Sequence, residues 1–282
     1  MKIIWCAVLY LFSLQLGFSQ HDGTRDSVRL IARGDFEKVP KTLLKKPYGG
    51  DAEILFVEML ALLGQDQAQA ALAKAREAVD AGLPFERLLL GYTMDTETGA
   101  ADALGALHEL KEFQSWKTEL KPKEILHGPM LGNVQHDRAS IWFRTEGKAT
   151  VSLHLASGPE GDVFEVVGKA RPKGSQDRTA VIDISDLLAD TEYRYYLATD
   201  SGEKTPVHRF RTAPAKGSAG KFSIGFGGGA GFVDKWEYMW DTIRAKAPDA
   251  FLMLGDNVYI DDPEHQLTHH YCYYLRQARP EW

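Results

Sequence analysis

The sequence feature that most constrains the fold is a series of short apolar runs between His127 and Pro214. Each run is rich in Val, Ile, Tyr and Phe and is bounded by Gly, Pro, Asp or Ser. Several such runs at regular spacing predict short β-strands in two packed antiparallel sheets. The expected strands are Ala139–Thr145, Thr150–Ala156, Val163–Val167, Thr179–Ile184, Glu192–Thr199 and Val207–Thr212. We therefore expect a β-sandwich over residues 126–214.

Helical periodicity dominates the chain before this region, over residues 21–125. Leu55, Met59 and Leu62 fall at i, i+4 and i+7, and the alanine-rich run from Ala68 to Ala81 is a strong helix former. Turns with glycine recur at a spacing of about 30 residues, near the period of tetratricopeptide-type repeats. An α-helical, repeat-like segment and an irregular helical bundle fit this pattern equally well. His, Asp and Glu do not cluster here, so we expect a scaffold or a binding surface for a protein partner.

The first 20 residues differ from the rest of the chain. Lys2 precedes an apolar stretch from Ile3 to Leu16, and the small residues Gly17 and Ser19 follow it. This arrangement is typical of a secretory signal peptide, and the stretch is shorter than the roughly 20 apolar residues that a spanning helix needs. We expect a protein exported to the periplasm or the extracellular space, without a stable membrane anchor. An uncleaved anchor is the alternative.

Charge and cysteine content narrow the class of function. The formal net charge is −6, and it is spread along the chain without a basic run. The electrostatic footprint that phosphate-backbone binding needs is therefore missing, and we expect no nucleic-acid partner. Cleavage of the signal peptide would remove Cys6 and leave Cys272 as the only cysteine, which excludes an internal disulfide.

Residues 220–282 carry the chemistry. A short apolar strand, Phe222–Phe226, runs into the glycine-rich run Gly227–Gly231, and a helix is expected from about Trp236 to Ala247. A second apolar strand, Ala250–Leu254, then leads into the loop Gly255–Asp261. This order predicts the start of an α/β domain with parallel strands. Ligands of such sheets bind beyond the carboxyl ends of the strands, where both loops lie.

Asp256 and Tyr259 are the candidate metal ligands in the second loop. A carboxylate at the tip of a buried strand can bridge two cations, and paired cations clamp the oxygens of an in-line phosphoryl displacement. Gly255 allows the sharp turn that would aim Asp256 into the site. Tyr259 could add a phenolate to a hard ferric ion. The simpler alternatives are an Asp that begins a turn and a Tyr that only packs.

Two motifs resemble known families. The stretch from Leu187 to Tyr193 resembles the corner of fibronectin type III domains, which implies a structural, buried Tyr193. The stretch Gly255-Asp256-Asn257-Val258-Tyr259 resembles the Gly-Asp-x-x-Tyr motif of metallophosphoesterases. Purple acid phosphatases and PhoD-like alkaline phosphatases both carry this motif behind a fibronectin-like domain. Residues 128–145, 240–256 and 273–281 are similar to the PhoD-like family, which we favour.

The resemblance implies a metal site and an activity. In that family Asp256 would be shared between metal ions, Tyr259 would bind the ferric ion, and Ca²⁺ and Fe³⁺ would be the cofactors. Gly227 stands at the position of the family's iron-binding cysteine, and it has no ligating side chain. The implied activity is that of a phosphomonoesterase or phosphodiesterase acting on a phosphate ester. The alternative is an extracellular helical-repeat and β-sandwich binding protein with a degenerate phosphatase domain.

The family's remaining ligands lie downstream of the matched residues. We therefore expect the chain to be part of a longer protein and to be inactive by itself. The expected organisation is a signal peptide over residues 1–20, a helical segment over 21–125, a fibronectin type III-like β-sandwich over 126–214 and an incomplete α/β metallophosphoesterase domain over 220–282.

Other residues in the segment 220–282 each have a functional and a simpler interpretation. Gly227 and Gly228 could cradle a phosphate or only form a tight turn. Asn257 and Asp261 could support the metal ligands from behind, although Asp261 and its neighbour Asp262 are expected to cap the following helix. A solvated helix face is expected for His265 and His269, and surface pairing for Arg276 and Arg279.

Overall fold

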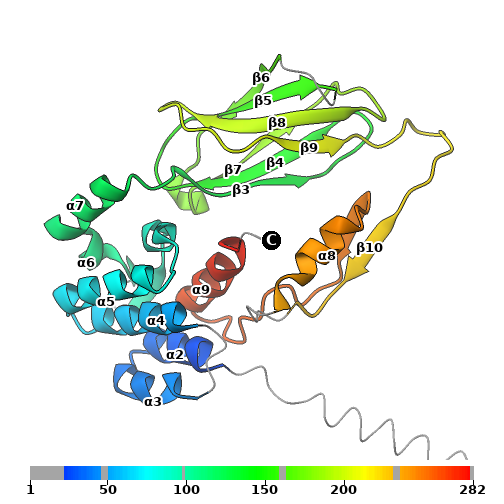
Figure 1. Cartoon of the computed structure of the whole chain (residues 1–282). Coiled ribbons are helices and arrows are strands. Elements are labelled where there is room, and N and C mark those ends of the chain that lie inside the picture. The colour runs from blue at the N-terminus through cyan, green and yellow to red at the C-terminus, as the bar shows by residue number, and fades with distance from the viewer. Residues whose placement is uncertain (1–21, 46–49, 97–98, 159–162, 231–235, 280–282) are drawn as a thin grey trace, which may run out of the picture.

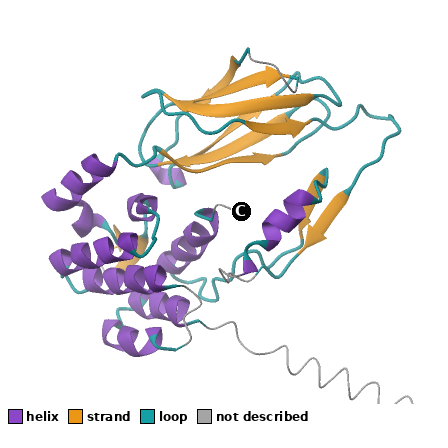
Figure 2. Ribbon diagram, viewed as in Figure 1, coloured by secondary structure: helices purple, strands orange, loops and turns teal. Residues whose placement is uncertain are grey.

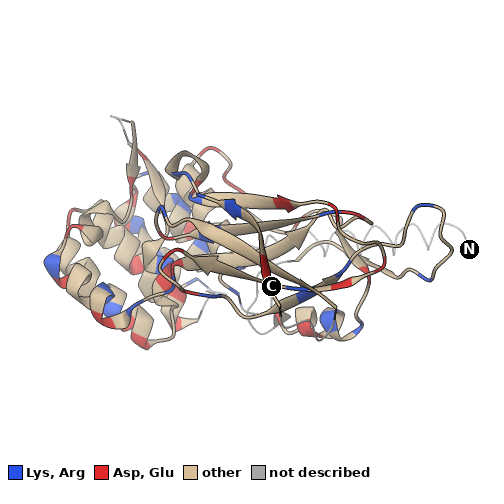
Figure 3. Cartoon of the chain, turned by 90° about the horizontal axis from the view of Figure 1, so that it is seen from above, with Lys and Arg blue, Asp and Glu red and all other residues tan. Residues whose placement is uncertain are grey.

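The computed structural model describes residues 22–45, 50–96, 99–158, 163–230 and 236–279. The expected signal peptide, residues 1–20, lies outside the described residues. Helices and strands separate into distinct parts: a helical part, a β-sandwich and a small parallel strand pair (Figures 1 and 2). Both signs of charge are interspersed over the described chain (Figure 3). Within the described ranges, no helix combines the length and the apolar character that crossing a membrane requires.

The N-terminal part is helical, as its periodicity predicts. Asp22 begins the first helix, because its Oδ1 accepts the backbone N–H groups of Thr24 and Arg25, both at 2.9 Å. The elements are α2 (Gly23–Ala32), η1 (Phe36–Lys38), α3 (Val39–Leu43), α4 (Asp51–Gly64), α5 (Ala68–Asp80), η2 (Phe85–Leu89), α6 (Gly105–His108) and α7 (Lys111–Leu120).

A helix from the far end of the chain completes the core of this part. In α9 (Gln266–Gln277), Leu267 and Tyr271 are fully buried against the helical residues Phe56 and Met59. Figure 1 shows α9 beside α2 and α4 although more than 200 residues separate them. The helical core is therefore built from both ends of the described chain.

The helical part also contains a hairpin, so the expectation of helices alone is wrong. Strands β1 (Thr93–Thr96) and β2 (Gly99–Asp102) pair antiparallel. All four residues of β2 are exposed, so the hairpin has no alternation of buried and exposed residues that could be recognised in the sequence. Its position depends on a distant contact, since the N–H of Thr93 donates to His270 Nδ1 of α9 at 2.9 Å.

The β-sandwich consists of a three-stranded sheet, β3-β4-β7, and a four-stranded sheet, β6-β5-β8-β9. Ile141, Phe143, Leu153 and Leu197 are fully buried between the two sheets. All strand pairs are antiparallel. The strands are β3 (Ile125–Gly132), β4 (Ala139–Thr145), β5 (Val151–Ser157), β6 (Glu165–Ala170), β7 (Thr179–Ile184), β8 (Glu192–Thr199) and β9 (His208–Arg211).

Two strands differ from the sequence expectation. β3 is interrupted in sequence by Gly128-Pro129, and only the family resemblance indicated it. The expected strand Val163–Val167 lies instead at Glu165–Ala170, on the edge of its sheet. Val166 and Val167 are exposed there, so their apolar character does not mark a buried face. A register shift between Leu153 and His154 sets this pairing.

The sandwich contains the tyrosine corner that the resemblance implied. Tyr193 is buried, and its hydroxyl oxygen accepts the N–H of Leu188 at 2.8 Å. Leu187 packs against the sandwich core, whereas Leu188 is exposed. The hydroxyl thus finds the backbone partner that a buried tyrosine needs.

The third part is a parallel strand pair with one helix. β10 (Ile224–Gly227) pairs with β11 (Ala250–Met253), and the register places Ile224 opposite Ala250 and Gly227 opposite Met253. α8 (Met239–Ala245) connects them and is shorter than the expected Trp236–Ala247. Because both strands end at the same edge, the two loops that follow them start side by side.

Candidate metal site at the end of β11

The glycine run and the motif loop lie against each other at the carboxyl ends of β10 and β11. The N–H of Leu254 donates to the carbonyl oxygen of Gly227 at 2.8 Å, and the N–H of Gly229 donates to that of Gly255 at 3.2 Å. A Cβ at Gly228 would lie only 3.0 Å from the Gly255 oxygen. A side chain at position 228 would therefore crowd this close approach of two backbones.

Asp256 and Tyr259 converge at this edge of the sheet. The Tyr259 hydroxyl lies 3.4 Å from Asp256 Oδ2, and the Asp256 side chain is exposed. Gly255 and Asp256 have φ values of +114° and +53°, so the chain turns sharply just before the loop. A normal O–H···O hydrogen bond is about 2.7 Å long, whereas two oxygens bound to one Ca²⁺ can lie up to about 5 Å apart. The spacing is compatible with a shared hard cation.

The other candidate residues near the motif loop differ in what they could offer a metal ion. Gly227 lies in the last position of β10 and offers its backbone alone. Asn257 Oδ1 is buried and has no hydrogen-bond partner among the described residues. The same ranges contain no group of three or more His, Cys, Asp or Glu side chains placed to hold a metal ion. Ca²⁺ takes 6–8 oxygen ligands, so Asp256 and Tyr259 would supply only two of the donors that such an ion needs.

Asp261 and Asp262 do not cap the following helix. α9 starts at Gln266 with His265 as its N-cap, and no side chain caps it. Asp261 Oδ2 instead accepts from Arg29 at 3.1 Å, and Asp262 Oδ2 accepts from Arg33 at 3.2 Å. Arg29 lies on α2 and Arg33 is its C-cap, near the other end of the chain, so no local pattern could have indicated the pairing.

His265 and His269 do not share a helix face. His265 precedes α9, and its Nδ1 lies 3.1 Å from Asp262 Oδ1. His269 lies in α9, and its Nε2 is 3.0 Å from the carbonyl oxygen of Pro263. Both imidazoles therefore contact the segment just before α9, at Asp262 and Pro263.

Arg276 is buried, so the expectation of surface pairing is wrong for it. Its side chain pairs with Glu237 Oε2 at 2.5 Å and donates to the carbonyl oxygen of Ala230 at 2.7 Å. Burial lowers the pKa of Arg276, and the Glu237 carboxylate opposes this shift. α9 is thereby tied to the end of the glycine run. The sequence shows the arginine but not its buried acidic partner.

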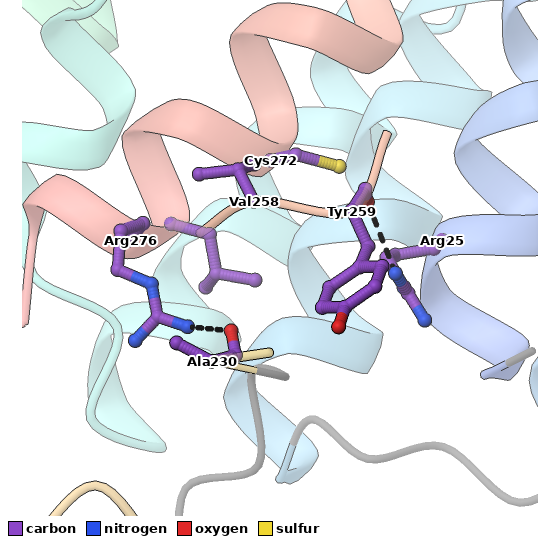
Figure 4. A pocket seen from close by; sticks show the side chains of 7 residues that line it. Arg25, Ala230, Val258, Tyr259, Cys272 and Arg276 are labelled. Atoms are coloured by element: carbon purple, nitrogen blue, oxygen red, sulfur yellow. Dashed lines mark hydrogen bonds between the residues drawn. The ribbon is translucent and has the colours of Figure 1, made fainter. Parts of the chain in front are cut away.

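A cavity of about 20 Å³ lies beneath this contact, between α2, α9 and the motif loop. Figure 4 shows Arg25 reaching the backbone of Tyr259 on one side and Arg276 reaching Ala230 on the other. A space of this size holds about one water molecule and no substrate. It is lined by Arg25, Ala230, Val258, Tyr259, Cys272, Leu275 and Arg276.

Comparisons with known proteins concern mainly the sandwich. A sequence family described as a domain of unknown function (DUF7800) matches residues 122–216. No curated protein matches the chain significantly.

Several solved structures resemble parts of the fold. PhoD is similar over 52% of this chain, with 17% identity and a TM-score of 0.42, and the chain spans 35% of PhoD's length. The fibronectin type III domain of human fibronectin type III domain containing protein 3 is 15% identical over 36% of this chain and 94% of its own, with a TM-score of 0.27. The sensor domain of the anti-sigma factor RsgI4 from Pseudobacteroides cellulosolvens is 17% identical over 33% of this chain and 95% of its own, also with a TM-score of 0.27. The described elements themselves form a helical part and a β-sandwich, and fibronectin type III domains are among the neighbours of the sandwich.

Proposed function

We propose that this chain belongs to an exported, metal-dependent phosphoric ester hydrolase and supplies its first metal-binding strand. The observation that carries the proposal is the convergence of Asp256 and Tyr259 at the carboxyl end of a parallel strand, 3.4 Å apart. The ligand-binding edge of a parallel sheet is where such a site belongs. A phosphomonoester and a phosphodiester are both candidate substrates.

The donor atoms fit hard cations. Carboxylate and phenolate oxygens suit Ca²⁺ or a ferric ion, and Asp256 and Tyr259 would hold it. Gly227, in the family's cysteine position, offers no side chain to iron. When bound, the cations would activate a water molecule and neutralise charge on the phosphoryl oxygens.

The surrounding residues have supporting roles in this proposal. The Gly229 N–H binds Gly255, so it fixes the two loops to each other. Gly228 remains the candidate for backbone contact with phosphate. Asn257 Oδ1, buried and lacking a partner among the described residues, would accept a hydrogen bond from a ligand of the site.

One observation favours a second candidate function. With glycine at position 227, the site lacks the family's sulfur ligand. An extracellular binding protein with a degenerate phosphatase domain would tolerate that loss. Its helical part would then bind a protein partner.

The proposal is tested with Asp256→Asn, which keeps the shape of the side chain and removes its charge. We expect Mn²⁺ binding, measured by electron paramagnetic resonance, to weaken. We also expect hydrolysis of 4-nitrophenyl phosphate and bis(4-nitrophenyl) phosphate, by the protein made from its complete reading frame, to fall by about 100-fold or more.

Asp241→Asn is the matched control, because Asp241 is an exposed carboxylate of α8 that pairs with Arg244. Hydrolysis and Mn²⁺ binding that are equal in Asp256→Asn and wild type would contradict the proposal. Mn²⁺ binding without hydrolysis would favour the binding protein.

A further inference from the structure

The N-terminal helix α2 presents a row of three arginines to the motif loop. Arg25 and Arg29 are four residues apart on one face of α2, and Arg33, four residues further, is the C-cap of the helix. We call them the arginine row. The segment that they contact, Tyr259–Asp262, is more than 220 residues further along the chain.

The first two arginines bind the backbone of this segment. Arg25 Nη1 donates to the carbonyl oxygen of Tyr259 at 3.0 Å, and Arg29 Nη2 donates to that of Ile260 at 3.3 Å. A backbone contact fixes the path of the loop regardless of the side chain at that position. Figure 4 shows the Arg25 contact at the edge of the small cavity.

The Arg25 guanidinium is itself held in place. Its Nε donates to Asp22 Oδ2 at 2.6 Å, and Asp22 is the buried N-cap of α2. The Arg25 and Arg29 side chains are only 11% and 13% exposed. Arg29 Nη1 likewise donates to Asp26 Oδ1 at 2.7 Å, so both guanidinium groups have a carboxylate partner outside the loop, which lowers the side-chain entropy that the loop contact costs.

The loop needs such support. Asp256 and Asp261 both have positive φ, at 53° and 55°, a conformation that L-residues seldom adopt. Val258 and Ile260 pack partly buried against the helical core, which anchors the loop from its apolar side. The arginine row supplies the polar part of the same attachment.

We propose that Arg25 and Arg29 are positioning residues for the candidate metal ligands. By binding the carbonyl groups of Tyr259 and Ile260, they hold the loop in the conformation that brings Asp256 and Tyr259 together. The helical part is then a built-in component of the metal site. This inference rests on the proposed function as far as the metal is concerned, whereas the hold on the loop can be measured without metal.

Native-state proteolysis tests the hold on the loop directly, because the carbonyl that Arg25 binds belongs to the peptide bond that chymotrypsin cuts after Tyr259. The double variant Arg25→Gln, Arg29→Gln is compared with wild type in metal-free buffer, and products are identified by mass. We expect cleavage after Tyr259 to accelerate by about tenfold or more, because tenfold is the effect of losing one charged hydrogen bond and the double variant loses two. Cleavage after the exposed Tyr238 is the internal reference.

Arg244→Gln is the matched control, since Arg244 is an exposed arginine that pairs with Asp241 on α8. It should leave the Tyr259 cut unchanged. If the double variant is cut everywhere because it does not fold, cleavage after Tyr259 is measured in the single variant Arg29→Lys instead. This variant keeps the charge and loses the forked geometry of the guanidinium group. Unchanged cleavage after Tyr259 in the folded variant overturns the proposal.

Mn²⁺ affinity, measured by electron paramagnetic resonance, separates positioning from mere stabilisation. We expect it to weaken about tenfold in the double variant, although Asp256 and Tyr259 are both retained. A loosened loop with unchanged Mn²⁺ affinity overturns the positioning role. If the wild-type chain binds no Mn²⁺ but the double variant is still cut faster after Tyr259, the arginines hold the loop as proposed. That outcome would count against the proposed function instead.

Discussion

At the scale of single residues, one buried histidine in this chain is held by a charged partner. His127 is buried, and its Nδ1 lies 2.6 Å from Arg144 Nη1. Arg144 in turn pairs with Asp177, which accepts from the hydroxyl of Tyr274 at 2.6 Å. Burial, together with the Arg144 charge, lowers the pKa of His127 to about 3. The imidazole is therefore neutral in the folded protein and accepts a hydrogen bond from the guanidinium.

This pKa shift makes stability depend on pH. Below about pH 6.5 the unfolded chain binds a proton at His127 that the folded protein excludes, so stability is lost as the pH falls from 6.5 toward 3. The loss attributable to this histidine is about 1.4 kcal/mol per pH unit. Urea unfolding at several pH values should show this slope in wild type and a smaller slope in His127→Gln. Equal slopes would contradict it, and the less buried His136→Gln is the control.

Residues whose partners are nearby in sequence could be placed from the sequence. Tyr193 binds the backbone five positions earlier, and Asp256 and Tyr259 are three residues apart, so a local motif contains both partners. The burial of Arg276 and the pairing of Asp261 could not be predicted in this way. Their partners come from other elements, Glu237 and Arg29, and only the folded chain brings them together.

At the scale of elements, α9 is the helix that connects the parts. Leu267, Tyr271, Tyr274 and Leu275 follow helical spacing and are all buried. This apolar face can be recognised in the sequence, whereas its partners cannot. The Tyr271 hydroxyl donates to Glu53 Oε2 of α4 at 3.0 Å, and on the sandwich side Tyr274 contacts Asp177.

The Glu53 carboxylate that binds α9 also forms a buried ion pair with Arg87 of η2. Arg87 Nη1 lies 2.7 Å from Glu53 Oε1, and Arg87 is 1% exposed. Glu53→Ala leaves this cation buried without its carboxylate and should lower the free energy of unfolding by about 3–5 kcal/mol in urea titration. Glu77→Ala, in an exposed pair with Lys74, should change it by less than about 1 kcal/mol. A similar change in both variants would contradict the role of the buried pair.

At the scale of the whole molecule, the parts of the described chain that pack together are not the parts that follow one another in sequence. Composition and periodicity predicted a helical part, a sandwich and a strand–helix–strand unit in sequence. They could not predict that α9, which follows the strand–helix–strand unit, packs into the core of the helical part. Periodicity identifies an apolar face of a helix without identifying what covers it. The parallel strand pair, by contrast, follows from its local strand–loop–helix–strand order.

Shortening a buried side chain of α9 should therefore destabilise the helices at the other end of the chain. Leu267 is fully buried in the helical core, and Leu267→Ala should lower the stability of that core by about 2–5 kcal/mol. Hydrogen exchange followed by mass spectrometry should show faster exchange in α4 and α5, with β5 and β8 of the sandwich unchanged. Leu252→Ala, at an exposed position of β11, is the control. Loss of protection confined to α9 itself would contradict this shared core.

The position of α9 also has a consequence in time. A ribosome adds about 5–20 residues per second, and more than 200 residues separate α4 from the helix that covers it. The newly made helical part must therefore wait on the order of ten seconds or longer with its apolar groove open. During synthesis we expect chaperones to bind these exposed apolar side chains, until α9 packs against them and buries them.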